Sequence, residues 1–284
     1  MNVKYVFAVV CLFVSMAGAQ TRPEWREWNQ PVEPFRIIGN IYYVGASDIT
    51  SFLIASPKGH ILLDGGFAET APQIRDNIRK LGFKVEDVKY LLLTQSHFDH
   101  AAGLAALKRW SGAKFVASRE DGGQVARGGK GDFQWGDEVS FEPVTTDQFI
   151  QDGDTLELGG NRMVARITPG HTKGCTTWTT VAEEKGKRYN VVFLCSTTAP
   201  GYNLVGNREY PTIIEDFRKT FQLLHSMSCD VMLGAHGSFF QLNKKRELLA
   251  KSKTNPFVDR QELSAFVQKS KVEFEAEVKR QQQK

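Results

Sequence analysis

The chain has 284 residues, of which 41% are hydrophobic, and it carries a formal net charge of +4 at pH 7. A chain of this length can bury one large hydrophobic core or two small ones. Its lysines and arginines are scattered among acidic residues and form no basic stripe. The composition therefore argues against a protein that binds nucleic acid.

The amino terminus has the pattern of a secretory signal peptide. A positively charged start is followed by an almost wholly apolar run at residues 5–16 and by an Ala-Gly-Ala cleavage site that ends at Ala19. A transmembrane anchor is disfavoured because the run is short and no stop-transfer charges follow it. Cys11 lies inside the run rather than after a lipobox, which argues against a lipid anchor. We expect residues 1–19 to be removed and residues 20–284 to form one periplasmic domain without a stable membrane anchor.

Three cysteines remain once Cys11 has been removed, and they are Cys175, Cys195 and Cys229. An odd number allows at most one intramolecular disulfide, and the spacing does not say which two residues would pair. The hydrophobic core, rather than a disulfide framework, must therefore stabilise the fold.

The first half of the mature chain is predicted to alternate strands with helices, after an arm at residues 25–34 that lies over the surface. Apolar runs bounded by Gly, Pro and Asn predict the strands, and an apolar face at helical spacing predicts the helices. In chain order we expect a hairpin at 35–44 that turns at Gly39-Asn40, strands at 50–55 and 60–63, a helix capped by Thr70 and stopped by Gly82, a strand at 88–93, a helix at 101–110 and a strand at 114–117.

The second half begins with residues 120–138, which are rich in Gly and charge and lack periodicity, so they are expected to form a loop near the mouth of a site. The remaining expected elements are a strand at 155–158 between two Gly-rich turns, a strand at 163–167, a strand pair at 175–181 and 191–194, an amphipathic helix at 210–227, a strand at 229–234, and helices at 241–251 and 261–280.

A motif rich in possible metal ligands follows the predicted strand at 88–93. The chain changes there from apolar residues to Thr-Gln-Ser-His-Phe-Asp-His, which places His97, Asp99 and His100 within four positions. Two imidazoles and a carboxylate suit a borderline cation such as Zn²⁺. An incidental polar loop is the weaker interpretation, because two of the chain's six histidines occur here.

Two further histidines follow predicted strands. His171 lies in the turn Pro-Gly-His-Thr, and His236 follows the strand at 229–234. Three separated segments thus deliver imidazole groups to what we expect to be one edge of a sheet. We interpret His60, at the start of a strand, as structural, and His225, beside the apolar face of a helix, as a packed or half-exposed residue.

The motif resembles the signature His-x-His-x-Asp-His of the metallo-β-lactamase superfamily, with Gln95 at the first ligand position. The Pro-Gly-His-Thr turn is also similar to a zinc-ligand turn of that superfamily. Ser196, near the position where other subclasses carry a ligand cysteine, and the Ala-Pro-Gly-Tyr loop at 199–202 are similar to subclass B3 of the class B β-lactamases. A minority branch of that subclass has Gln at the first position. The resemblance implies an α/β protein with a four-layer αββα sandwich.

The same resemblance implies zinc-dependent hydrolysis of β-lactam antibiotics, which confers resistance to them. A metal-bound hydroxide would attack the lactam carbonyl, while Asp99 binds metal and orients the water. A first site would consist of Gln95, His97 and His171, and a second site of Asp99, His100 and His236. Because Gln95 is a weak ligand, the enzyme would bind one or two Zn²⁺ ions. Ser196 and Thr198 are candidates for binding the substrate carboxylate, and the protein is expected to be a monomer.

Fold alone does not decide function, so two alternatives stay open. The first is another hydrolase of the same fold that acts on a thioester or a lactone. Glyoxalase II-like thioester hydrolases normally add a bridging Asp, which the stretch 193–196 lacks, and export argues against a glutathione thioester as substrate. The second is a metal-binding protein without activity, which would require the Gln95 change to abolish hydrolysis. A Ser-x-x-Lys match at 111–114 lacks its companion motifs and is interpreted as chance.

Overall fold

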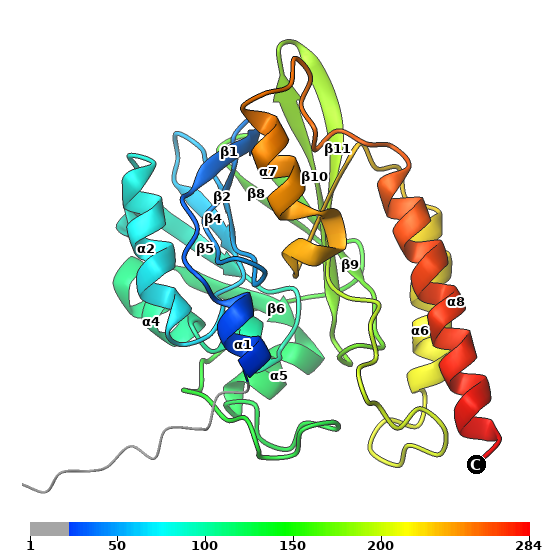
Figure 1. Cartoon of the computed structure of the whole chain (residues 1–284). Coiled ribbons are helices and arrows are strands. Elements are labelled where there is room, and N and C mark those ends of the chain that lie inside the picture. The colour runs from blue at the N-terminus through cyan, green and yellow to red at the C-terminus, as the bar shows by residue number, and fades with distance from the viewer. Residues whose placement is uncertain (1–22) are drawn as a thin grey trace, which may run out of the picture.

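The structure is a computed structural model, and it describes residues 23–284 (Figure 1). The predicted signal peptide, residues 1–19, lies outside the described residues. Within the described part of the chain, no helix is long and apolar enough to cross a membrane.

Seven strands form the first sheet in chain order. The strands β1 to β4 are antiparallel neighbours, whereas β4, β5, β6 and β7 run parallel. Parallel neighbours need a crossover, and helices α2 (Thr70–Lys80) and α4 (Leu104–Ser111) lie within two of these crossovers. The strands are β1 (Phe35–Ile38), β2 (Ile41–Tyr43), β3 (Phe52–Ile54), β4 (His60–Leu63), β5 (Val88–Leu92), β6 (Lys114–Ser118) and β7 (Gln148–Ile150).

The second sheet has five strands in the order β12-β11-β10-β9-β8. Its centre is the long hairpin of β10 and β11, in which Trp178 pairs with Phe193 and Glu184 pairs with Lys187. The turn at residues 185–186 has positive φ at both positions, as a tight hairpin turn requires. The strands are β8 (Thr155–Leu158), β9 (Asn161–Ile167), β10 (Thr176–Glu184), β11 (Lys187–Leu194) and β12 (Val231–Gly234).

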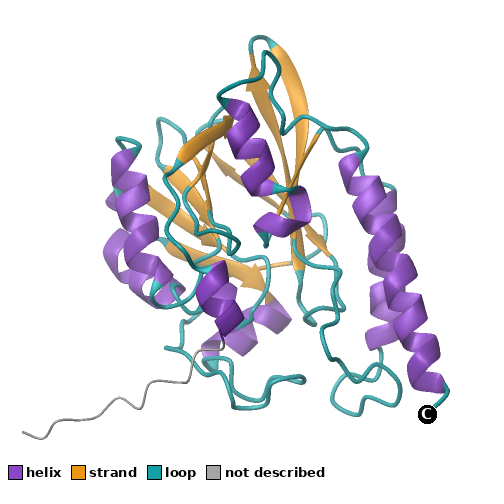
Figure 2. Cartoon of the chain, in the orientation of Figure 1, coloured by secondary structure: helices purple, strands orange, loops and turns teal. Residues whose placement is uncertain are grey.

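The two sheets pack face to face and helices cover their outer faces (Figure 2). Alternation along β5 shows how the layers form, because Leu91 packs in the core under α2 and α4 whereas Leu92 packs in the core between the sheets. On the other side, α6 (Ile213–His225) and α8 (Glu262–Gln282) cover the second sheet. The predicted four-layer αββα sandwich is confirmed.

The prediction of a loop across residues 120–138 is wrong for its first part, where the structure has helix α5 (Arg119–Ala126). Ser118 caps this helix by accepting a hydrogen bond from the backbone N–H of Asp121. Gly122 misled the prediction because its role is packing. A Cβ atom at this position would lie 2.6 Å from the Thr146 hydroxyl oxygen.

Other boundaries also differ from the prediction. The expected helix at 101–110 is divided into α3 (Phe98–Ala101) and α4, because the backbone N–H of Gly103 donates to the Gly66 carbonyl at 3.0 Å rather than continuing the helix. Thr70 is the first residue of α2 rather than its cap, and its hydroxyl donates to Asn29 Oδ1. Helix α1 (Pro23–Trp28) was not predicted and lies in the expected arm. Helix α7 (Leu242–Leu249) lies within the helix predicted at 241–251.

A disulfide joins Cys175, just before β10, to Cys195, just after β11, across a separation of 20 residues. Both cysteines are fully buried, and Cys229 is the unpaired one among the described cysteines. The bridge closes the open end of the β10–β11 hairpin, beside the turn that carries His171. The structure thus supplies the pairing that the spacing of the cysteines left open.

Replacing both Cys175 and Cys195 with Ala should lower the free energy of unfolding by about 3 kcal/mol, because a closed loop of this length restricts the unfolded chain. Denaturant melts of the wild-type and variant proteins measure the difference. Cys229→Ala is the matched control, because it removes a buried sulfur without removing a cross-link. A double variant no less stable than the control would contradict the prediction.

Candidate metal centre

The predicted ligands meet where three segments leave their strands at one edge of the sandwich. Residues 95–100 follow β5, His171 follows β9, and His236 follows β12. Because β4, β5 and β6 run parallel, the side chains that follow them lie at the same edge of the first sheet. The second sheet contributes its two histidines from the facing layer.

Asp99, His100 and His236 form one cluster. Asp99 Oδ2 lies 3.3 Å from His100 Nε2 and 3.5 Å from His236 Nε2, and the two imidazole nitrogens are 3.4 Å apart. The three ligand atoms lie within 4.8 Å of one another. This arrangement of one carboxylate and two imidazoles fits a zinc ion.

His97 and His171 form a second, adjacent cluster, in which His97 Nδ1 lies 3.1 Å from His171 Nε2. Gln95, two residues before His97, is fully buried, and neither atom of its amide group has a hydrogen-bond partner among the described residues. An unpartnered buried amide group is costly. The Gln95 amide oxygen is thus not committed to another described group, while the two imidazole nitrogens of His97 and His171 are close enough to bind one metal ion.

The two clusters differ in their affinity for protons. Burial lowers the pKa of His97 to about 4 and that of His171 well below its ordinary value. Burial also opposes the charge on His100, but the Asp99 and Asp64 carboxylates outweigh it and raise the pKa of His100 to about 10. The rings of His97 and His171 are therefore neutral at pH 7, whereas a dication at the Asp99 cluster would displace protons.

A second ring of polar groups surrounds the predicted ligands, and the sequence analysis missed it. Asp48 Oδ2 lies 2.8 Å from His236 Nδ1, and Asp64 Oδ2 lies 3.6 Å from His100 Nδ1. Asp132 Oδ2 lies 3.7 Å from His97 Nε2. Of the three, only Asp48 is within hydrogen-bonding distance, and such a partner orients an imidazole and raises its basicity. Asp64 and Asp132 act on His100 and His97 through their charge, since His100 Nδ1 and His97 Nε2 have no hydrogen-bond partner among the described residues. Asp64 could have been found, because it ends the strand next to β5 in a parallel sheet.

Asp121 connects the loops that carry Gln95, His97 and His171. Its buried carboxylate accepts hydrogen bonds from the Ser96 N–H at 3.0 Å, the Thr172 hydroxyl at 2.7 Å and the Gly174 N–H at 2.9 Å. Burial dominates and raises the pKa of Asp121 to about 6. This residue thus joins two loops that are far apart in the sequence.

Ser196 and Thr198, the predicted substrate-binding residues, lie beside His171. The buried Ser196 Oγ lies 3.1 Å from Thr198 Oγ1 and accepts a hydrogen bond from the Thr198 N–H, while Thr198 is partly exposed. The Thr198 carbonyl oxygen lies 2.7 Å from His171 Nδ1. Tyr202, which the sequence analysis noted only as part of a loop, donates its hydroxyl to the His171 carbonyl at 2.9 Å.

The residues interpreted as structural lie outside this centre. The buried ring of His60 accepts a hydrogen bond from the Ser56 N–H and packs against Phe83. The prediction that His225 is packed or half-exposed is wrong, because it lies exposed at the end of α6. Ser111, of the chance Ser-x-x-Lys match, donates its hydroxyl to the Leu107 carbonyl within the last turn of α4. None of these three contacts is with a predicted metal ligand.

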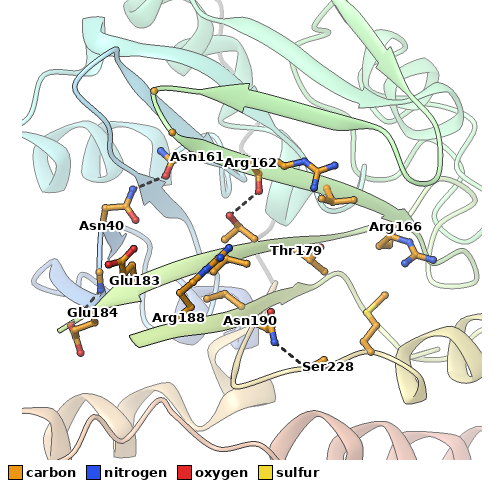
Figure 3. A pocket seen from close by; sticks show the side chains of 18 of the residues that line it. Asn40, Asn161, Arg162, Arg166, Thr179, Glu183, Glu184, Arg188, Asn190 and Ser228 are labelled. Atoms are coloured by element: carbon orange, nitrogen blue, oxygen red, sulfur yellow. Dashed lines mark hydrogen bonds between the residues drawn. The ribbon is translucent and has the colours of Figure 1, made fainter. Parts of the chain in front are cut away.

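A groove of about 1080 Å³ lies elsewhere, on the outer face of β9, β10 and β11 (Figure 3). Many of its polar side chains already pair with neighbours. Asn40 donates to Asn161 at 2.7 Å, Arg36 lies 3.5 Å from Glu184, and the Arg166 guanidinium bonds to a nearby aspartate. Its described lining includes no histidine, so the groove offers no site comparable to the two clusters.

The model of the Metallo-beta-lactamase superfamily matches residues 44–182. Among solved structures, a metallo-beta-lactamase from Cronobacter sakazakii is 40% identical, with 92% of this chain and all of that chain covered at a TM-score of 0.89. FEZ-1 from Legionella gormanii is 42% identical over 89% of this chain and 98% of its own, with a TM-score of 0.87. BJP-1 of Bradyrhizobium japonicum, a subclass B3 metallo-beta-lactamase, is 34% identical over 90% of this chain and 97% of its own, with a TM-score of 0.86.

Matches to curated proteins are shorter. The human mitochondrial persulfide dioxygenase ETHE1 is 31% identical over 39% of this chain and 34% of its own length. A hydroxyacylglutathione hydrolase from Maricaulis maris is 33% identical over 28% of this chain and 25% of its own. The chain thus matches about a third of these proteins or less, which supports a shared fold only.

Asp48→Asn should weaken metal binding at the Asp99, His100 and His236 cluster by about 10- to 100-fold, because the Asp48 carboxylate orients His236 and increases its basicity. Competition with a chromogenic chelator measures the affinity. Asp152→Asn is the matched control, because Asp152 bonds to Arg166 at the surface. Equal affinities for the wild-type and Asp48→Asn proteins would show that His236 is oriented without this carboxylate.

Proposed function

Because the chain belongs to the metallo-beta-lactamase superfamily and is similar over most of its length to subclass B3 enzymes, we propose that it hydrolyses the amide bond of β-lactam antibiotics with the help of zinc. The observation that carries the proposal is the presence of two imidazole pairs at one edge of the sandwich, with His97 3.1 Å from His171 and His100 3.4 Å from His236. Such an enzyme would confer resistance to these antibiotics.

The proposed zinc ligands divide between two sites. Gln95, His97 and His171 form the first site, and Asp99, His100 and His236 form the second. The unpartnered Gln95 amide and the short distances between imidazole nitrogens support this assignment. Zinc, when bound, lowers the pKa of water towards neutrality and polarises a carbonyl group.

The side chains of the site prepare it for hydrolysis. Burial opposes ionisation of Asp99, but His100 and His236 outweigh it and hold the pKa of Asp99 well below its ordinary value. The carboxylate is therefore ionised at pH 7 and can accept a hydrogen bond from the attacking water and orient it. Asp48 keeps the His236 ring in place through a hydrogen bond to its Nδ1. No serine acyl-enzyme is needed, since Ser111 is engaged in α4.

The substrate carboxylate is proposed to bind at Ser196 and Thr198. The position of this hydroxyl pair beside His171 and the partial exposure of Thr198 support that role. We further propose that residues 1–19 direct export to the periplasm and that the mature protein acts as a monomer on a small-molecule substrate, without binding nucleic acid.

A colorimetric cephalosporin should be hydrolysed by the purified protein, and exhaustive chelation should abolish the activity because the ligands would then lack their metal. Serine-directed acylating inhibitors should have no effect. Re-addition of Zn²⁺ to the chelated protein, with its circular dichroism spectrum unchanged, is the control for unfolding. Full activity after chelation would contradict the mechanism, and metal binding without any hydrolysis would favour a metal-binding protein without activity.

The second site should fill before the first, because a neutral amide oxygen is a weaker donor to Zn²⁺ than an imidazole nitrogen. Titration of metal-free protein followed by metal analysis should give one tight and one weaker equivalent. Gln95→His, with the same neighbours, should strengthen the weak site. Two equally tight equivalents in the wild-type protein would refute the prediction. If Gln95→His still binds only one ion, the shape of the site, and not the ligand at position 95, determines how many ions bind.

A further inference from the structure

The loop that carries the proposed substrate-binding residues, 196–206, is held at its far end by a side chain from the last turn of α8. Gln281 Nε2 donates to the Tyr202 carbonyl at 2.8 Å. Gln281 Oε1 accepts from the Leu204 N–H at 2.8 Å and from the Val205 N–H at 3.1 Å. One side-chain amide therefore binds three backbone groups of this loop across 76 to 79 residues of sequence.

The hydrogen-bonding neighbours determine which way the amide group points. Two backbone N–H groups face its oxygen, and the Tyr202 carbonyl and a Glu277 carboxylate oxygen at 2.7 Å face its nitrogen. The reversed orientation would oppose donor to donor and acceptor to acceptor. Glu277 is in turn paired with Arg280 in the same helix. The glutamine amide acts here like one peptide group of a neighbouring strand.

Helix α8 is a firm support for this contact. Phe274 packs against Phe217 of α6 with ring centroids 4.6 Å apart, and Arg218 pairs with Glu275 at 2.8 Å. Val278, one turn before Gln281, is buried in the same core. The backbone of Gln281 is thus fixed relative to the core of the second sheet, and its side-chain amide holds the loop at a fixed place against that core.

The side chain of Tyr202, whose carbonyl binds Gln281, reaches the metal centre. The Tyr202 hydroxyl donates to the His171 carbonyl, and its ring stacks on the His171 ring. Gln281 binds the main chain of this same Tyr202, so displacement of its contact would move both Tyr202 and the segment that precedes it. We propose that Gln281 is a positioning residue that sets the place of the 196–206 loop for binding substrate, an inference that rests on the proposed function.

Gln281→Ala and Gln282→Ala form a matched pair, because Gln282 is the next residue of the same helix end and is exposed. Amide hydrogen exchange should accelerate at residues 202–206 in Gln281→Ala and stay as in the wild type in Gln282→Ala, with α6 and the body of α8 equally protected in all three proteins. This measurement does not depend on catalysis. Unchanged exchange in the loop of Gln281→Ala would overturn the proposal.

The kinetic test uses the colorimetric cephalosporin. KM should rise about tenfold in Gln281→Ala, the effect of losing roughly one to two net hydrogen bonds, while kcat changes less. Zinc content should equal that of the wild type. Gln281→Glu retains the acceptor for Leu204 and Val205 but sets a carboxylate oxygen against the Tyr202 carbonyl and the Glu277 carboxylate, so its KM should rise at least as much as that of Gln281→Ala.

Two outcomes, one kinetic and one from metal analysis, would overturn the substrate role. An unchanged KM alongside faster exchange would mean that the pinned loop does not bind substrate, and a lost zinc equivalent would assign Gln281 to the support of His171 instead. If the wild-type protein hydrolyses no β-lactam, the proposed function fails and the substrate role of Gln281 is overturned with it. The exchange experiment still decides in that case whether Gln281 holds the loop, so the two failures are distinguishable.

Discussion

The rest of the structure depends on the burial of imidazole and carboxylate groups within hydrogen-bonding distance of one another. Such groups are expensive to remove from water unless other polar groups replace the solvent. The chain provides those groups from distant segments, with Asp48 beside His236, Asp64 beside His100 and the Thr198 carbonyl beside His171. Both sheets contribute, so the cluster exists only when the two sheets have packed.

The two halves of this cluster differ in the charge that they bury. His97 and His171 are buried as neutral rings. Their burial costs free energy because ring-nitrogen lone pairs are left without hydrogen-bond donors. Asp99, His100 and His236 are buried as a charged group, and mutual attraction compensates for lost hydration. A cation would satisfy the lone pairs of the first half, and in the second half it would replace bound protons.

Much of this arrangement could be predicted from the sequence because its signals are local. An apolar run that ends in His-Phe-Asp-His indicates a buried strand and candidate ligands together, and the same holds for His171 and His236. Most of the order of strands and helices could be predicted for the same reason, because apolar spacing and turn residues are also local signals. Asp48, by contrast, meets His236 across 188 residues, and no local pattern reports such a contact. The helix at Arg119–Ala126 was missed because Gly122 is required by a neighbour, Thr146, that only the folded chain brings near it.

The disulfide beside the His171 turn has a consequence for how the protein responds to reducing agents. The sulfurs of Cys175 and Cys195 have no exposure to solvent, and Cys195 lies against the Thr94 carbonyl of the ligand loop. Thiol–disulfide exchange requires a thiolate to reach one of these sulfurs. A small thiol can therefore attack only during moments when the wall of the metal centre opens. The rate at which such a thiol reduces the disulfide consequently reports how often that wall opens in the intact protein.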